Sequence, residues 1–402
     1  MSKSVWNISF ICLLVIALFQ SMGQMMINTL IPLYAYELGA TAQVVGFVTG
    51  AFAITALLIR PFAGPAFDSF SKKRILNAAL VLITFAMFLY SLSTSIPMVF
   101  ASRLLHGLGM GCAGPVALAL TGESLPHDKV NLGLSIFSLS FAVSQAAGPA
   151  VVLWLHNAVG FEWTFRISAA SMFVAWLLTF FVKESSPAPR KKYQVKLSRI
   201  IAIKSLMPAG LNILLVVPFS CINGFIVIYG NLNGVDGIGW FFTVYALCLL
   251  ATRPVFGGLA DRYGAGKIIP IGLVFFGASL VIIWHATSFY VYIAAALIGA
   301  FGYGAVSPLL QSLSIQCAPR DERGAASNTY YIGLDLGYLI GPVLGGLIVD
   351  VLCGYGFGEL QAYSSMYLIM LVPVVLALVL FLLKRESINQ LLLGSNENPA
   401  NN

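Results

Sequence analysis

The stretch RPVFGGLAD at Arg253–Asp261 decides the fold, because it repeats RPFAGPAFD at Arg60–Asp68. The two copies lie 193 residues apart, and the same spacing relates further glycines, prolines and aspartates. The matched pairs are Gly109/Gly302, Gly111/Gly304, Pro115/Pro308, Pro126/Pro319, Asp128/Asp321, Gly148/Gly341 and Pro149/Pro342. Near the front, Ile27-Asn28 matches Ile222-Asn223 at a spacing of 195, which indicates one small insertion. A register held over so much of the chain predicts two copies of one structural unit.

The composition indicates that lipid surrounds most of the chain. Hydrophobic residues make up 59% of the 402 positions and charged residues 9%, against roughly 25% charged in an ordinary soluble protein. The apolar runs are continuous rather than alternating, which favours helices over the strands of a membrane β-barrel. We expect an all-α membrane protein with twelve transmembrane helices in two parallel-repeat six-helix bundles. The predicted spans are about 8–36, 42–63, 75–93, 97–121, 132–155, 162–183, 201–230, 237–257, 267–286, 289–314, 325–350 and 362–383.

The distribution of the positive charges indicates how the chain is oriented in the membrane. Lysines and arginines gather in the loops on the side of the N-terminus, as at Lys72–Arg74, Arg190–Lys196 and Arg320–Arg323. The opposite loops, near 37–41, 94–97, 156–161, 231–236 and 353–361, carry none. The positive-inside rule therefore predicts an integral protein of the plasma or inner membrane with both termini in the cytoplasm. The net charge of +7 then belongs to this pattern and not to a nucleic-acid-binding surface.

The repeat also predicts the domain boundaries. We expect an N-terminal bundle at residues 1–183, a cytoplasmic linker at 184–200, a C-terminal bundle at 201–386 and a polar disordered tail at 387–402. The linker holds Pro187, Pro189 and a run of basic residues.

Three motifs resemble the major facilitator superfamily over nearly the whole chain. Gly64-x-x-x-Asp68 and Gly257–Gly264 resemble the loop motif that follows the family's second and eighth helices, although Ser71 stands where glycine is usual. Arg103–Gly109 resembles the fourth-helix motif of proton-coupled members, and Gly148-Pro149 the fifth-helix motif of proton-driven exporters. The resemblance implies alternating access by a transporter similar to the drug/proton antiporters of the multidrug-efflux branch.

Asp335 is the most informative single residue of the sequence. It lies about 15 Å into the span 325–350, near the middle of the bilayer, where an ionised carboxylate is costly. Asn328, Tyr331 and Tyr338 share its helical face. We interpret Asp335 as a proton carrier or cation site; a neutral, hydrogen-bonded aspartic acid that holds helices together is the alternative.

Arg103 and His106 lie three residues apart and so share one face of the span 97–121. The resemblance implies proton coupling or recognition of substrate charge for Arg103, whereas a side chain that snorkels to the interface is the structural alternative. His106 titrates near neutrality, so it is either a proton-sensitive neighbour or a packed neutral histidine.

Two polar stripes complete the candidate site. Gln20, Gln24 and Asn28 follow the first span, and Tyr303, Ser307 and Gln311 follow the tenth. In the superfamily the first, fourth, seventh and tenth helices line the central cavity, so the resemblance implies a substrate surface. Hydrogen bonding between helices explains the same residues equally well.

The repeated motifs predict gating and packing residues. A carboxylate at Asp68 or Asp261 can cap a helix and pair with an arginine such as Arg60 or Arg253, which would hold one face shut. Gly64 and Gly257 accompany these aspartates. The Gly-Pro pairs Gly148-Pro149 and Gly341-Pro342 predict close helix packing.

The function classes follow from what the sequence contains. It has no Walker-type phosphate loop and no catalytic constellation, so we expect neither ATP-driven transport nor an enzyme, and no cofactor or metal. The leading hypothesis is a monomeric, proton-coupled exporter of small amphiphilic or cationic molecules. The alternative is a proton-coupled uptake symporter for a small nutrient or metabolite; a receptor or scaffold would need a folded sensing domain, for which the loops are too short.

Overall fold

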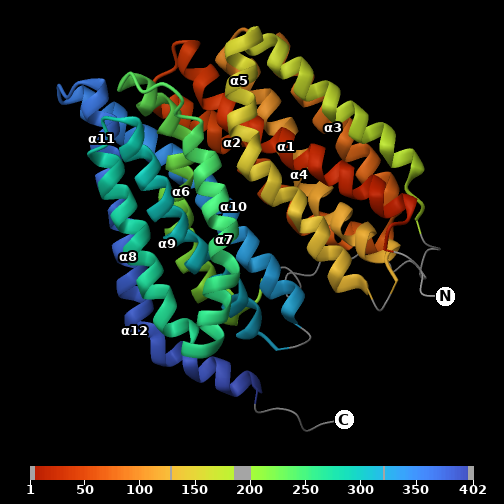
Figure 1. Cartoon of the computed structure of the whole chain (residues 1–402). Helices are drawn as coiled ribbons and strands as arrows, with labels where there is room; N and C mark the ends of the chain where they lie inside the picture. Colours follow the sequence, from red (N-terminus) through yellow and green to blue (C-terminus); the bar gives the residue numbers. More distant parts are fainter. Residues whose placement is uncertain (1–4, 127–128, 185–200, 320–321, 397–402) are drawn as a thin grey trace. The chain divides into compact units, whose positions relative to one another are not determined.

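The computed structural model describes residues 5–126, 129–184, 201–319 and 322–396 and consists there of helices and short connections. Figure 1 shows the course of the chain. The helices are α1 (Ile8–Glu37), α2 (Ala42–Ser69), α3 (Lys72–Leu92), α4 (Ile96–Ser124), α5 (Val130–Leu178), α6 (Leu206–Leu232), α7 (Trp240–Tyr263), α8 (Ala265–Trp284), α9 (Phe289–Gln316), α10 (Arg323–Gly354), α11 (Glu359–Ile369) and α12 (Leu371–Asn396).

The predicted twelve spans are present, with one pair joined. Ten helical stretches of the described chain are long and apolar enough to cross a membrane. One of them, in α5, would extend about 74 Å as a straight helix, more than twice the thickness of a bilayer core. It bends at Gly160, where φ is 76° and ψ is 176°, and its two arms meet near the top of Figure 1. Counting these arms separately and adding α7, whose apolar part is Trp240–Thr252, gives twelve spans.

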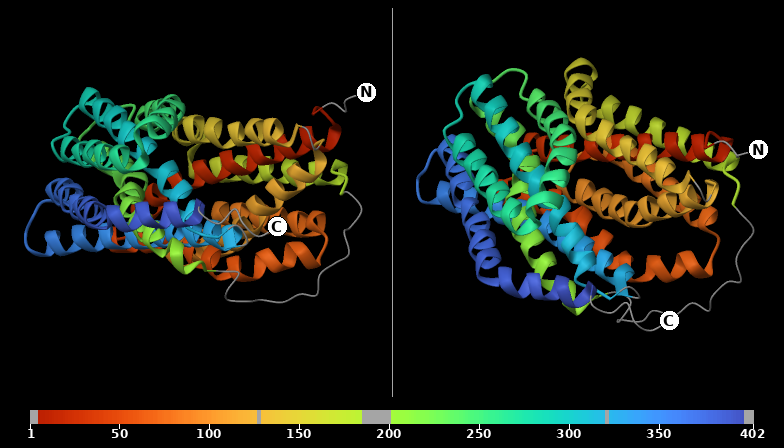
Figure 2. Two further views of the ribbon diagram at one scale, coloured as in Figure 1. Left: turned by 90° about the horizontal axis from the view of Figure 1, so that it is seen from below. Right: turned by 60° about the horizontal axis from the view of Figure 1, so that its bottom comes forward.

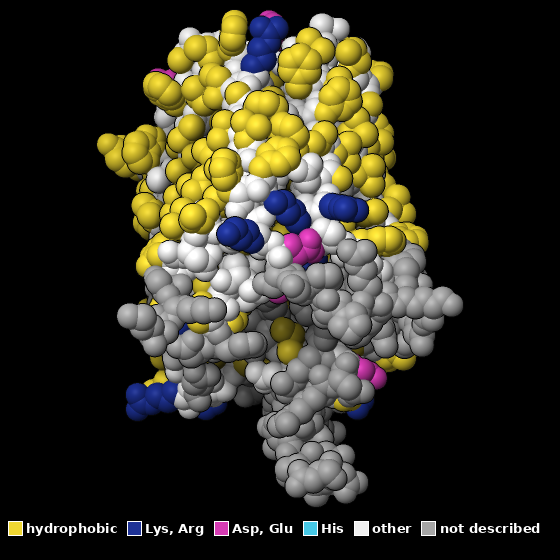
Figure 3. Space-filling view, turned by 90° about the vertical axis from the view of Figure 1, so that its right-hand side faces the viewer, with side chains coloured by type: hydrophobic (Ala, Val, Ile, Leu, Met, Phe, Trp, Pro, Cys, Tyr) yellow, Lys and Arg dark blue, Asp and Glu magenta, His cyan; other side chains and the backbone are white. Residues whose placement is uncertain are grey.

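Large apolar side chains cover the outside of the helices, as expected where lipid is the solvent. Leu58, Trp154 and Ile203 expose 63%, 69% and 80% of their surface. Figure 3 shows one such face, whose upper part is nearly continuous hydrophobic surface. In water, exposed patches of this extent would drive association, so the surface itself supports a membrane location.

The chain forms two compact units. The first comprises Met1–Ala40 and Phe47–Val195, and the second comprises Thr41–Gly46 and Lys196–Asn402. In the first unit α1 packs against α5, and α3 packs against α4 and α5. In the second unit α6 packs against α10, and α8 packs against α9 and α12 (Figure 2). Helices that correspond in the two repeats thus pack against corresponding partners, as a duplicated bundle requires.

Glycines of the repeat make equivalent close approaches in the two units. A Cβ placed on Gly109 in α4 would lie 2.6 Å from Cγ1 of Ile83 in α3. A Cβ on its repeat mate Gly302 in α9 would lie 2.4 Å from the backbone nitrogen of Phe276 in α8. Ile83 and Phe276 are themselves 193 residues apart, so the duplication extends to the individual contact.

The glycine of each Gly-Pro pair lies against the first helix of its unit. A Cβ on Gly148 in α5 would lie 2.7 Å from Cβ of Met25 in α1. On Gly341 in α10 it would lie 2.0 Å from Oγ of Ser220 in α6, and Met25 and Ser220 are mates at the spacing of 195. Any larger residue would therefore force these helix pairs apart.

The first turn of α2 is part of the second unit, where Asp350 of α10 caps it. The two carboxylate oxygens accept hydrogen bonds from the backbone N–H groups of Ala42, at 3.0 Å, and Gln43, at 3.1 Å. A Cβ on Gly346 would lie 2.0 Å from the carbonyl oxygen of Ala42, so α10 and this turn meet backbone to backbone. A carboxylate at this end of a helix satisfies free N–H groups and favours the helix dipole.

The chain end differs from the sequence interpretation. Helix α12 continues to Asn396, so residues 387–396 are helical where a disordered tail was expected. The run Leu391–Leu393 supplies strong helix formers directly after the last span. Residues 397–402 and 185–200, which hold the rest of the tail and most of the linker, lie outside the described residues.

Candidate functional site

The first candidate site is the Arg103 cluster, formed by Asn28, Phe52, Tyr90, Arg103 and His106 from α1–α4 of the first unit. Gly107 permits it, because a Cβ there would lie 2.2 Å from the carbonyl oxygen of Phe52. Helix α2 therefore approaches α4 closely, and the Phe52 ring lies beside both Arg103 and His106.

Arg103 is held by neutral groups. Only 2% of its surface is exposed, so it does not snorkel to the surface of the bundle. Its Nη2 donates to Oδ1 of Asn28 at 2.8 Å and to the carbonyl oxygen of Thr49 at 3.3 Å. Its Cζ lies 5.1 Å from the centre of the Phe52 ring, in cation–π geometry. The structure thus brings the predicted Asn28 and Arg103 together.

His106 lies in the same cluster and is completely buried. Its Nδ1 lies 3.4 Å from the Tyr90 hydroxyl, and its ring packs edge-on against Phe52 with centroids 5.4 Å apart. Nε2 of His106, like Nε and Nη1 of Arg103, is buried without a hydrogen-bond partner among the described residues. Two of its three predicted members, Arg103 and His106, therefore carry buried polar atoms without a partner among the described residues.

The second candidate site is the Asp335 cluster in the second unit. Asp335 lies about 18 Å along α10 from its start and exposes 5% of its surface. Around it α9 and α10 are tied together by tyrosine hydroxyls. Ser307 Oγ and Tyr330 Oη lie 3.2 Å apart, and Gln311 Nε2 donates to Tyr331 Oη at 3.3 Å. The polar stripes predicted on these two helices are thus in contact.

Aromatic rings adjoin this cluster. Phe219 of α6 stacks on Tyr303 of α9 with centroids 4.1 Å apart and an interplanar angle of 19°. Phe219 also contacts Tyr245 at 5.8 Å and Tyr338 at 6.2 Å. These four residues, the aromatic cluster, come from α6, α7, α9 and α10 and join the face that carries Asp335 through Tyr338.

The sequence analysis does not predict five of the site residues, which are Phe52, Tyr90, Phe219, Tyr245 and Tyr330. The duplication relates three of them to other positions of the two sites. Tyr245 is the mate of Phe52 at the spacing of 193, and Phe219 is the mate of Gln24 at the spacing of 195. Gln24 itself is half-buried in α1, and its neighbour on the stripe, Gln20, lies 3.6 Å from the sulfur of Met110.

Most of the predicted gating side chains lie outside the described ones. These are Gly64, Asp68, Arg253, Gly257 and Asp261. Arg60 is described and half-buried in α2.

The residues that follow the first motif are held by local contacts. Ser71 caps α3 by accepting a hydrogen bond from the Arg74 N–H, and Lys72 forms an ion pair with Glu123 at 2.7 Å. Glu184 accepts from the Lys72 N–H at 2.8 Å and contacts the Ser71 hydroxyl. Serine replaces the family glycine at 71 because an extended N-cap, with φ of −66°, needs no glycine.

In the described part of the chain no three His, Cys, Asp or Glu side chains form a group that could hold a metal ion. The clusters instead offer one buried cation, one buried carboxyl group, hydroxyls and rings. Groups of these kinds have the chemistry to form hydrogen bonds and to exchange protons.

Comparison with known proteins gives one family. The model of the Major Facilitator Superfamily matches residues 13–235 and 209–399. The staphylopine export protein of Staphylococcus aureus is 23% identical over 401 residues, which cover 94% of this chain and 96% of that protein. A homolog of the multi-drug resistance efflux pump PmrA from Lactococcus lactis is 26% identical over 337 residues, 79% of this chain and 82% of that protein.

Solved structures agree on the fold. The nucleoside transporter NupG has a TM-score of 0.78 at 12% identity and covers 94% of this chain and 99% of its own. A POT family transporter in complex with 5-aminolevulinic acid has a TM-score of 0.78 at 13% identity, over 94% of this chain and 96% of its own. These relatives and neighbours are membrane transporters and not enzymes.

Proposed function

Because this chain belongs to the major facilitator superfamily, we propose that it is a proton-coupled exporter of small amphiphilic or cationic molecules that works by alternating access. The observation that carries the proposal is Asp335. A carboxyl group that exposes 5% of its surface in the middle of a membrane helix is costly to ionise and therefore suited to take up and release a proton.

The surroundings of Asp335 suit a coupled carrier. Ser307 and Gln311 of α9 and the hydroxyls of Tyr330 and Tyr331 of α10 are hydrogen-bonding groups that a carboxyl group or a bound molecule can also use. The rings of Phe219, Tyr303 and Tyr338 offer apolar faces that can also receive a cation. A protonated Asp335 would release a cation that the ionised form holds, which couples the two movements.

Export is the direction we favour, because two relatives, which cover 94% and 79% of this chain, are a staphylopine export protein and a multidrug efflux pump homolog. Proton-driven uptake of a nutrient or metabolite is the alternative. We propose that the protein is a monomer and that both termini lie in the cytoplasm.

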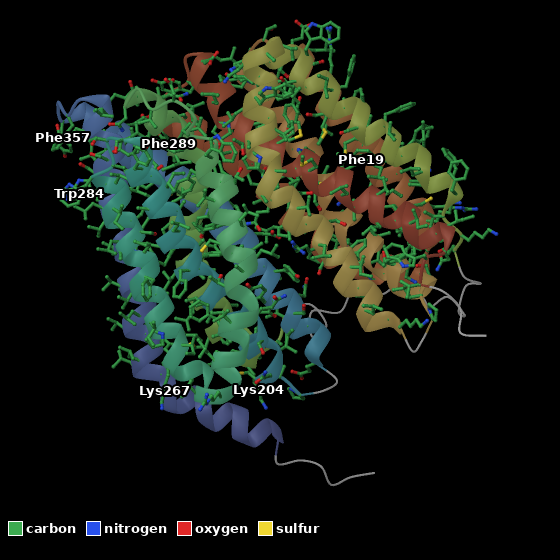
Figure 4. All side chains as sticks on the ribbon, viewed as in Figure 1. Phe19, Lys204, Lys267, Trp284, Phe289 and Phe357 are labelled. Carbon is green, nitrogen blue, oxygen red and sulfur yellow. The ribbon has the colours of Figure 1, made fainter. Side chains whose placement is uncertain are left out.

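The ends of the second unit support the proposal that both termini lie in the cytoplasm. Figure 4 shows Lys204 and Lys267 at one end of it, and Trp284, Phe289 and Phe357 at the other. Lysines prefer the cytoplasmic side, so we assign the end that carries Lys204 and Lys267 to the cytoplasm. We place the gating residues Arg60, Gly64, Asp68, Arg253, Gly257 and Asp261 at the cytoplasmic end, on the basis of the repeated motif alone.

The test is transport by purified protein in liposomes, with ethidium and norfloxacin as probes and an internal pH indicator. Export predicts that probe and protons move in opposite directions, whereas movement in the same direction would establish the uptake alternative. Asp335→Asn should lower proton-driven flux at least tenfold and weaken binding of the cation ethidium, because the neutral amide cannot hold a cation as the ionised carboxylate does. Asp236→Asn, in the exposed connection before α7, is the matched control. Unchanged proton-driven flux in Asp335→Asn would remove the proposed coupling role.

A further inference from the structure

We propose that Arg103 binds a carboxylate group of the transported molecule. The inference rests on the proposed function, because it names the substrate class of the same transporter. The Arg103 cluster carries a buried positive charge. The proton-coupling role proposed for Asp335 does not account for that charge.

Arg103 is a buried cation with no counter-ion in the described part of the chain. Among the described residues it donates to Asn28 and to the carbonyl of Thr49, and it also interacts with the Tyr90 hydroxyl; all three groups are neutral, and no carboxylate pairs with it. The ion pairs described in the first unit are Lys72–Glu123 and Arg166–Glu162, near the helix ends. Burying a guanidinium without an anion costs several kcal/mol. A bound anion would offset that cost.

The cluster offers donors for such an anion. Nε and Nη1 of Arg103 are buried without a hydrogen-bond partner at regular geometry among the described residues, so they can donate to a bound anion, with the neutral Tyr90 hydroxyl as their neighbour. Nε2 of His106, one helical turn away, is also buried and unused. When the Tyr90 hydroxyl donates to Nδ1 of His106, a neutral ring carries its proton on Nε2 and can donate as well.

The remaining neighbours fix the guanidinium without neutralising it. The Asn28 oxygen anchors Nη2 at 2.8 Å, and the Phe52 ring covers one face of the group. A planar, oriented guanidinium with free N–H groups matches the two oxygens of a carboxylate better than it matches a spherical ion.

Depth distinguishes a transported molecule from a lipid. Arg103 is about 10 Å along α4 from its start at Ile96, below the level of the lipid headgroups. A phosphate group of the bilayer would have to leave the interface to reach it. The substrate we infer is therefore an amphiphilic acid or zwitterion, which narrows the class of small amphiphilic molecules.

The experiment compares benzoate with benzamide, which has the same shape and no charge. Thermal unfolding and binding are measured on the full chain in lipid nanodiscs, with gluconate as the background anion. Wild type should bind benzoate at least tenfold more tightly than benzamide. Arg103→Met should abolish this preference and, without ligand, unfold no more easily than wild type, because it removes an uncompensated charge. Arg74→Gln, on the exposed part of α3, should keep the preference.

A second variant tests the same site without removing the arginine. Asn28→Asp would place a carboxylate at the position that now lies 2.8 Å from Nη2, and this internal anion should lower benzoate affinity at least tenfold. Equal binding of benzoate and benzamide by wild type, or a preference that survives both substitutions, would overturn the proposal. Stabilisation by chloride equal to that by benzoate would overturn the substrate assignment, because the site would then hold an inorganic ion.

The two proposals fail in different ways. Benzoate preference that depends on Arg103, together with absent proton-driven flux, would disprove the export proposal and leave this site in place. Proton-driven export of ethidium, together with equal binding of benzoate and benzamide, would disprove the carboxylate site at Arg103 and leave the export proposal in place.

Discussion

The carboxylate of Asp350, near the end of α10, accepts a hydrogen bond from the backbone N–H of Ala42, the first residue of α2, at 3.0 Å. Its other oxygen accepts from the next amide, so one side chain satisfies two of the four N–H groups that a helix start leaves free. The cap joins residues more than 300 positions apart in the sequence and is part of the second unit.

Removing this cap should destabilise the protein. Asp350→Ala is expected to cost about 1–2 kcal/mol of unfolding free energy, and Asp350→Asn about half of that, because the amide keeps one acceptor oxygen. Unfolding in detergent measures both values. Asp236→Asn, on an exposed turn, should change stability by less than about 0.5 kcal/mol. Equal stability of Asp350→Ala and wild type would show that the cap contributes nothing.

The close approach at Gly302 predicts a second effect. Gly302→Ala should lower stability by about 1–3 kcal/mol, because its methyl group would lie 2.4 Å from the backbone of Phe276. Gly210→Ala in α6 is the control, since nothing lies within 4 Å of a Cβ there. The control should be neutral or stabilising by up to about 1 kcal/mol, because alanine restricts the unfolded chain. Similar losses for both variants would contradict the contact-based explanation.

The contact between Ser307 and Tyr330 predicts a coupling between α9 and α10. A double-mutant cycle with Ser307→Ala and Tyr330→Phe should give an interaction energy of about 0.6 kcal/mol, the typical size for hydrogen bonds between membrane helices. Unfolding free energies of the four proteins supply the cycle. Additive effects of the two substitutions would mean that the hydroxyls do not stabilise each other.

The aromatic cluster predicts a change in affinity rather than in coupling. Phe219→Leu removes the stacked ring on Tyr303 and should weaken binding of an aromatic probe about threefold to tenfold, since such stacking contributes about 0.5–1.5 kcal/mol. Proton movement per transported molecule should stay the same. Phe85→Leu, a substitution on the lipid-exposed side of α3, should affect neither quantity. Unaltered affinity in Phe219→Leu would exclude the cluster from the binding surface.

The general architecture could be predicted because it depends on patterns that extend over many residues, namely the apolar runs and the internal repeat. Continuous apolar runs predict the spans, and the spacing of 193 between Arg60 and Arg253 predicts the duplicated unit. The structure agrees on the all-helical fold. The bend at Gly160 was expected as a loop at 156–161, since the sequence does not distinguish a loop from a helix that turns at a single glycine with positive φ.

The site could be predicted only in part, because side-chain contacts depend on which helix faces meet. Asn28, Arg103 and His106 were selected as polar residues in apolar helices, and the structure gathers them in one cluster. Phe52 was not selected, since one phenylalanine among many carries no signal of its own. Asp350 was also missed, because an aspartate near a helix end ordinarily faces water, and its partners are backbone amides that leave no trace in residue identity.

The place of Thr41–Gly46 has a consequence for dividing the gene product. A cut in the chain between α5 and α6 would separate the repeats, yet the fragment that begins there would lack the six residues that complete its own compact unit. Asp350 in that fragment would lose both amides of its cap. We therefore expect that the second half, expressed alone, is degraded or misassembled. Co-expression of the first half as a separate fragment should restore its folding.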